Sequence, residues 1–121
     1  MHFIVKPTFD HLNNNHKPFS NTQFQELNTM SNKLLKLCNI IIDSVKKEDF
    51  EEMDYIIEIQ NDLLAYIDQS RKIQIKRIKN KEVGTRNSML FMNLLSETKN
   101  ITLYSVNLYK SQRDFVKQNN D

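Results

Sequence analysis

The sequence predicts an all-α fold, an elongated antiparallel three-helix bundle with a short N-terminal segment. Its 121 residues suffice for one domain, and they include one glycine and two prolines, too few for the turns of a many-stranded sheet. Apolar residues recur three and four positions apart over three long stretches, the spacing of amphipathic helices. We expect an N-terminal segment or linker at residues 1–20 and the bundle at residues 21–118, with helices at about 21–46, 49–79 and 85–117.

The first expected helix begins at Ser20 or Asn21, since either side chain can accept a hydrogen bond from an unpaired backbone N–H. Cys38 has no cysteine partner, and it is interpreted as a small core residue in a reducing compartment. The apolar stripe comprises Phe24, Leu27, Met30, Leu34, Cys38, Ile41 and Val45, broadened by Leu35, Leu37, Ile40 and Ile42.

The second expected helix is capped by Asp49 and changes from acidic to basic along its length. Its second half has isoleucines at positions 73, 75 and 78, which leave a short strand as the less favoured alternative. Gly84 and the cap candidate Thr85 mark the turn to the third helix. The apolar face expected for the third helix comprises Leu90, Phe91, Leu94, Leu95, Ile101, Leu108 and Phe115.

Composition excludes several classes of function. The 17 basic and 15 acidic residues give a net charge of +2, too balanced to predict nucleic-acid binding. Gly84 is the single glycine, which excludes glycine-rich phosphate loops. No apolar run approaches the ~20 residues of a membrane span, and no signal peptide is evident, so we expect this chain itself to be soluble. With no catalytic constellation, we expect no enzyme activity, no cofactor and no small-molecule substrate.

Four carboxylates form one stripe of the second helix at spacings of three, four and four: Glu51, Asp54, Glu58 and Asp62. Carboxylates spaced in this way on helices can hold a hard cation or a di-metal centre. No Glu-x-x-His motif accompanies them, and a solvated face tolerates their mild repulsion. We favour the solvated face and keep cation binding, or docking to a basic partner, as alternatives.

The third helix carries an asparagine every seven residues. Such a repeat is consistent with side-chain amides bonded across helices that fix the register, with Asn28, Asn32 and Asn39 as counterparts, or with plain exposure. The candidate polar seam is Asn93, Glu97, Asn100, Tyr104 and Asn107.

The three histidines, at positions 2, 11 and 16, lack the spacing and partners of a zinc site. The basic run from Arg71 to Lys81 is interpreted as a solvated helix end, with phosphate head groups or an acidic partner as the alternative.

The segment from Arg86 to Ile101, followed by Tyr104-Ser105-Val106-Asn107-Leu108, resembles the closing helix of PhoU-like domains, in particular the cytoplasmic C-terminal domain of sodium/phosphate cotransporter family proteins. The resemblance spans about residues 24–116. It implies an antiparallel three-helix bundle, often present in two copies. It also implies that this chain acts at the cytoplasmic face of the inner membrane as part of a membrane protein.

PhoU-like helices of this type carry two metal-binding acidic residues ahead of the positions matched by Tyr104 and Asn107. Lys99 and Leu103 occupy those two positions here. The acidic neighbour Glu97 has Ile101 four residues later, so a shifted register does not restore the pair. We therefore expect no metal in this helix.

Together these observations lead us to expect a non-catalytic regulatory module of a sodium-dependent phosphate transporter. It would dock by a helix face onto the transmembrane part of the transporter or onto a second copy of itself. The residues expected to support a homodimer are Met89, Met92, Leu103 and Val106, which lie off the main apolar stripe. The alternatives are a carboxylate-rich metal-binding bundle and a free-standing helical adaptor.

Overall fold

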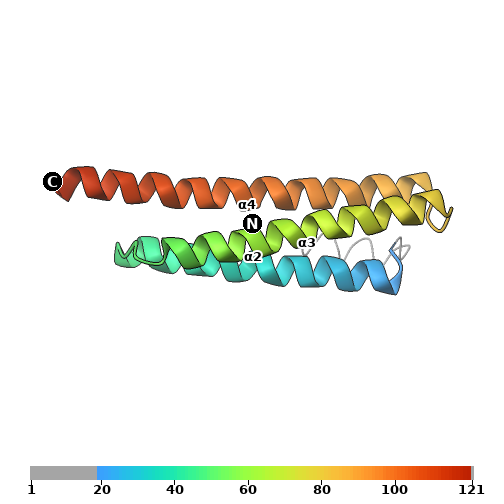
Figure 1. Ribbon diagram of the computed structural model, residues 1–121, viewed down its shortest axis with the longest axis horizontal. Helices are drawn as coiled ribbons and strands as arrows, with labels where there is room; N and C mark the ends of the chain where they lie inside the picture. Colours follow the sequence, from blue (N-terminus) through green and yellow to red (C-terminus); the bar gives the residue numbers. More distant parts are fainter. Residues whose placement is uncertain (1–18, 121) are drawn as a thin grey trace.

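The computed structural model describes residues 19–120 as three long helices, α2 (Asn21–Lys47), α3 (Met53–Lys79) and α4 (Thr85–Asn120). They lie side by side in a rod with the two turns at opposite ends, so that α2 and α4 run in the same direction and α3 runs against both (Figure 1). This confirms the predicted all-helical bundle and excludes a strand at residues 73–78. None of these three helices combines the length and apolarity needed to cross a bilayer.

The buried positions of all three helices are spaced three and four residues apart, with one departure from strict alternation at Ile59 to Ile67 of α3. In α2 they are Gln23, Leu27, Met30, Leu34, Leu37, Ile41 and Ser44, a strict alternation of four and three residues. In α3 they are Ile56, Ile59, Leu63, Ile67, Ser70, Gln74 and Arg77, and in α4 they include Phe91, Leu95, Thr98, Thr102, Ser105 and Tyr109. A repeat of 3.5 residues keeps one narrow seam facing the neighbouring helices along the whole rod, as in coiled coils.

The buried seam of α4 is more polar than predicted. Thr98 and Thr102 are buried, and their hydroxyls donate to the carbonyls of Leu94 and Thr98 at 2.8 and 2.7 Å. Because each hydroxyl bonds to the preceding turn of its own helix, it can enter the core without an unpaired polar group. Leu108 and Phe115, predicted to belong to the apolar face, are instead 46% and 62% exposed.

Both turns close with a non-glycine residue in the left-handed conformation. Glu48 (φ 53°) ends α2 and Lys81 (φ 58°) follows α3, and in each case the next residue donates its backbone N–H to a carbonyl of the last helical turn. The prediction that Asp49 caps the second helix is wrong. Its carboxylate accepts from the backbone N–H of Glu51 at 3.1 Å, and α3 begins four residues later, at Met53. Thr85 is the first residue of α4 rather than its cap.

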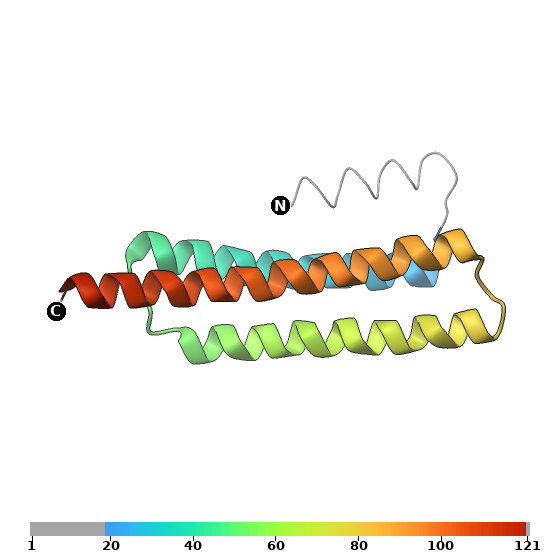
Figure 2. The same ribbon diagram turned by 90° about the horizontal axis from the view of Figure 1, so that it is seen from above.

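Figure 2 shows that α4 continues past the turn between α2 and α3. It has 36 residues against 27 in each of the other helices, a difference of about 13 Å at the helical rise. The C-terminal turns of α4 therefore extend beyond the bundle that its first half completes.

Truncation of the seam should be far more costly than truncation outside it. Leu63 has no exposed surface, so we expect Leu63→Ala to lower the free energy of unfolding by about 3 kcal/mol through lost burial and a residual cavity. Leu103, which is 37% exposed, is the matched control, and Leu103→Ala should cost less than about 1 kcal/mol. Urea denaturation followed by circular dichroism measures both. Equal losses in the two variants would contradict the assigned seam.

Candidate interaction site

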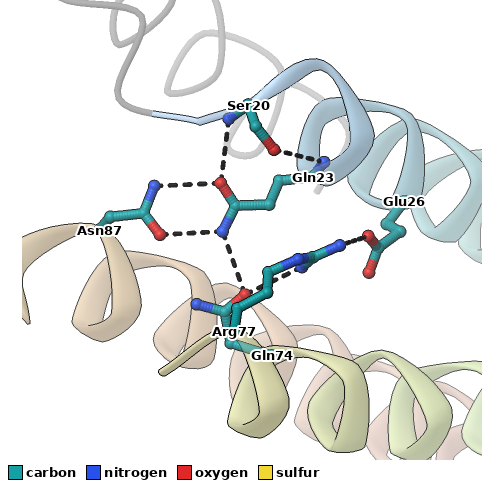
Figure 3. A network of polar contacts seen from close by, with 6 residues as sticks. All are labelled: Ser20, Gln23, Glu26, Gln74, Arg77 and Asn87. Atoms are coloured by element: carbon teal, nitrogen blue, oxygen red, sulfur yellow. Dashed lines mark hydrogen bonds and ion pairs between the residues drawn. The ribbon is translucent and has the colours of Figure 1, made fainter. Parts of the chain in front are cut away.

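Gln23, in the first turn of α2, is a buried polar residue whose side chain forms hydrogen bonds with both other helices (Figure 3). Its backbone N–H donates to the Ser20 hydroxyl oxygen at 3.2 Å, and its side-chain oxygen accepts from the Ser20 backbone N–H at 3.0 Å, which makes a capping box. Its amide nitrogen donates to Gln74 Oε1 in α3 and to Asn87 Oδ1 in α4, at 3.0 and 2.8 Å. Asn87 Nδ2 donates back to Gln23 Oε1 at 3.1 Å.

An ion pair extends this network along α3. Arg77 donates through Nη1 to Gln74 Oε1 at 2.9 Å and through Nη2 to the carboxylate of Glu26. The two charged side chains are only 11% and 12% exposed, and the guanidinium lies 5.8 Å from the ring centre of Phe91. Because so little water reaches the pair, each charge depends on its partner for solvation.

The polar layer, defined as Gln23, Glu26, Gln74, Arg77 and Asn87, has a structural role. Both donors and both acceptor sites of the Gln23 amide are used within the protein, so it has no free group to offer a substrate. A shift of any helix along the rod would separate these groups and leave them buried without partners. The layer therefore fixes the register of the bundle.

Tyr109 is the buried polar group at the opposite end of the rod. It has no exposed surface, and its ring packs against Phe50 of the α2–α3 turn at 5.3 Å between centres. Its hydroxyl finds no hydrogen-bond partner among the residues that the structure describes. Burial raises the pKa of Tyr109 above its ordinary value of 10.0, and the neighbouring carboxylates Asp49 and Glu52 add to the rise against the opposing effect of Arg113.

The carboxylate stripe of α3 lies on the outside of the rod. All four residues are exposed: Glu51, Asp54, Glu58 and Asp62. Asp62 pairs with Lys33 of α2 at 2.7 Å. Within residues 19–120 no three acidic, histidine or cysteine side chains come together as metal ligands would. The side chains of the stripe are therefore exposed to solvent rather than buried between helices.

A groove of about 250 Å³ lies between α2 and α3 beside this stripe. Its lining is Lys33, Lys36, Tyr55, Glu58, Ile59 and Asp62. Lys33 is occupied by Asp62 and also lies 5.6 Å from the ring centre of Tyr66. The groove therefore presents charges of both signs, of which Lys33 and Asp62 already neutralise each other. Its lining residues do not combine an acid, a base and a nucleophile as a catalytic site would.

The expected polar seam is not formed inside this bundle. All of its members are exposed on α4, namely Asn93, Glu97, Asn100, Tyr104 and Asn107, and so are the proposed counterparts Asn28, Asn32 and Asn39 on α2. The interhelical amides come instead from Gln23, Gln74 and Asn87. The regular asparagine spacing does not reveal them. The signals in the sequence that indicate them are polar residues at heptad seam positions and the Ser-x-x-Gln capping box at Ser20.

The residues expected to support self-association are divided by the structure. Met89 is 62% exposed and Leu103 is 37% exposed, while Met92 is half-buried. Val106 is only 1% exposed and belongs to the core, so its assignment to an outer surface is wrong. The reason is geometric, because one turn from Thr102 places it on the inner face of α4.

A second apolar strip runs along the outer side of α4, next to α2. Contacts from Asn87 to Gln23 and from Ser105 to Cys38 (3.9 Å) show which flank of α4 faces α2. The half-buried and exposed apolar residues of this flank are spaced three, four or seven positions apart. We define the outer strip as Leu90, Leu94, Ile101, Tyr104, Leu108 and Phe115, together with Ile42 of α2. It reaches into the C-terminal extension of α4.

Comparisons of this chain with protein-family models, with curated proteins and with solved structures give no match.

Removal of one partner from the buried ion pair should be more harmful than removal of both. We expect Arg77→Met to lower the free energy of unfolding by about 3 kcal/mol, because Glu26 is left as an unpaired charge away from water. The double variant Glu26→Leu/Arg77→Met should recover at least half of that loss. Chemical denaturation of Glu26→Leu, Arg77→Met and the double variant measures the coupling free energy between the two side chains. Strictly additive losses would show that the two charges do not depend on each other.

The raised pKa of Tyr109 predicts a loss of stability at alkaline pH. The unfolded chain releases its phenolic proton first as the pH rises above about 10, so this contribution to stability is complete below that pH and is lost as the pH approaches the higher folded pKa. Tyr109→Phe removes it, so the variant should lose less stability than the wild type on going from neutral to strongly alkaline pH. Parallel pH profiles of the free energy of unfolding would contradict the assignment.

Proposed function

We propose that this chain is a non-catalytic interaction module that docks through the outer strip of α4. The proposal is supported by the contrast between polar side chains paired in the interior and apolar side chains exposed on the surface. Most polar groups of the buried layer are paired within the protein, and Glu26 Oε1 is its one buried side-chain atom without a hydrogen-bond partner among residues 19–120. In contrast, Tyr104 and Phe115 are 64% and 62% exposed on one helix. Burying such a large apolar side chain against a partner yields about 1.5–3 kcal/mol. A partner helix laid along α4 would collect this gain at several positions.

The C-terminal extension of α4 is the observation that carries the proposal. Beyond the turn between α2 and α3, no other helix of residues 19–120 covers the inner side of α4, yet α4 retains Phe115 and the half-buried Val116 there. A solitary amphipathic extension of this kind is typical of a helix that another element completes. The outer strip and the extension together place the exposed side chains of Tyr104, Leu108 and Phe115 along one helix.

We further propose that the partner is the transmembrane part of a sodium-dependent phosphate transporter, with this chain as its cytoplasmic PhoU-like regulatory domain. The argument for it is the resemblance of residues 85–108 to the closing helix of such domains. A long three-helix bundle is also the fold that the resemblance implies. A second copy of this chain is the other partner that a helix face of this kind would fit, and the two are separated by experiment.

Loss of the outer strip should abolish docking. We expect the wild-type chain to co-purify with a sodium-dependent phosphate carrier from the same genome and to change sodium-dependent uptake of radiolabelled phosphate by cells that produce both. Leu108→Gln/Phe115→Gln should reduce co-purification at least about tenfold, because it removes apolar contacts worth more than 1.4 kcal/mol. The control is Tyr55→Gln/Ile73→Gln, which changes two exposed apolar residues of α3 and should retain docking.

Equal co-purification of the two double variants would contradict docking through α4. Absence of any carrier from the purified wild-type complex would contradict the transporter assignment. In that case light scattering at high micromolar concentration tests the second copy. A dimer that Leu108→Gln/Phe115→Gln dissociates would retain the interaction module, and a monomer would remove it.

A further inference from the structure

The rod has a strong charge polarity along its axis. The turn between α2 and α3, residues 48–54, carries five carboxylates and no cation. At the other end, residues 71–86 carry seven lysines and arginines and one carboxylate, Glu82. The two turns lie at opposite ends of the molecule (Figure 2). The near-neutral total charge of the chain therefore conceals one acidic and one basic end.

Most cations of the basic end are free to meet an external anion. Arg77 is used by Glu26, and Arg71 and Lys72 share Asp68 at 3.8 and 3.3 Å. Within residues 19–120, the remaining four cations have no carboxylate within ion-pair distance, and all are exposed: Lys76, Lys79, Lys81 and Arg86. They come from the last turns of α3, the turn itself and the first turn of α4.

Apolar side chains lie among these cations. Ile75 and Ile78 of α3 are 39% and 43% exposed, and Met89 of α4 is 62% exposed. The contact of Gln74 with Ser88 and that of Arg77 with Phe91 show that these parts of α3 and α4 lie side by side. Each exposed apolar residue follows one of those contacts by a single position in the chain, about 100° further round its helix. The three therefore project outward at one level of the rod.

We propose that this basic apolar patch, defined as Ile75, Ile78 and Met89 with Lys76, Lys79, Lys81 and Arg86, binds the surface of an anionic lipid bilayer. Lysine and arginine side chains are attracted to anionic head groups, each raising the binding constant about fivefold. Exposed isoleucine and methionine side chains gain by entering the boundary between head groups and acyl chains. The two effects act together only on a ligand that is both negatively charged and apolar beneath its surface.

The composition of the patch favours a bilayer over other polyanions. Its apolar residues are aliphatic or methionine, and none is an aromatic ring on which a nucleic-acid base would stack. The α2–α3 groove, lined by Lys33 and Tyr55, lies on the other side of α3 and offers nothing to an acidic peptide here. A fluid bilayer needs no shaped recess, because lipids rearrange around cations contributed by two helices and a turn. This binding is separate from docking through the outer strip, which lies on the other flank of α4, next to α2.

The test uses the purified full chain and sedimented vesicles. One set of vesicles is phosphatidylcholine alone and the other contains about one-third phosphatidylserine. We expect binding to the anionic set only, with release as the salt concentration rises from about 0.1 M to about 1 M and the screening length falls to about 3 Å. No preference for the anionic vesicles would overturn the proposal.

Two triple variants with the same net charge locate the binding surface. Lys76→Gln/Lys79→Gln/Lys81→Gln should weaken binding about a hundredfold, as three fivefold losses predict. Lys36→Gln/Lys46→Gln/Lys47→Gln, exposed lysines of α2 outside the patch, should retain it within about fivefold, at most the effect of one cation at the surface. Thermal unfolding by circular dichroism verifies that both are folded. Equal weakening in the two variants would show attraction by total charge alone and overturn the proposal.

Two further measurements separate this proposal from its alternatives. Ile75→Gln/Ile78→Gln keeps the charge and should still weaken binding, whereas unchanged binding would reduce the patch to a polybasic surface and overturn the apolar part. Leu108→Gln/Phe115→Gln should bind anionic vesicles normally even if carrier docking fails, so the two proposals can fail independently. Salt-sensitive dimers formed without vesicles, and lost in the patch variant, would assign the basic end to the acidic end of a second copy.

Discussion

The bundle depends on a polar layer that joins its three helices at one end. The Gln23 side chain completes the capping box begun by Ser20 and also bonds to α3 and α4, so that one side chain contributes to both helix initiation and tertiary register. The aliphatic seam beyond it supplies most of the burial, but leucine and isoleucine contacts tolerate sliding by a heptad. Hydrogen bonds and the Glu26–Arg77 pair do not, because a displaced partner leaves a buried group unsatisfied. The layer thus selects one alignment among several of similar apolar burial.

Once the register is fixed, the surfaces of the rod follow. The heptad seam uses one narrow face of α4. The second apolar set on its flank is only half-buried at its start and becomes exposed from Tyr104 onward into the C-terminal extension. The same alignment brings the end of α3 beside the start of α4 and so gathers cations with Ile75, Ile78 and Met89. Both proposed binding surfaces are therefore consequences of how three helices are aligned, and neither is a pocket.

The errors of prediction concentrate in α4. Leu108 and Phe115 were assigned to the apolar face but are exposed, whereas Leu90 and Leu94 are half-buried and pack against the core. The fully buried seam is made by Phe91, Leu95, Thr98, Thr102, Ser105 and Tyr109. A helix with two apolar stripes does not reveal which one its own chain covers. The buried stripe is also hard to identify from hydrophobicity because it contains threonines, whose hydroxyls are satisfied by hydrogen bonds to the preceding turn. The asparagine heptad left both an interhelical seam and plain exposure open, because regular spacing says nothing about which side faces inward, and the structure shows exposure.

The sequence by itself determined the helical class, the three helices to within a few residues and the acidic and basic halves of the second one, because these depend on spacing, glycine content and charge along the chain. The tertiary structure decided which stripe of α4 is buried, that Gln23, Gln74 and Asn87 meet, and that Val106 is core. Those outcomes depend on the rotation and axial position of each helix against two others. They are fixed by the joint satisfaction of packing and buried hydrogen bonds, which no single stretch of sequence contains.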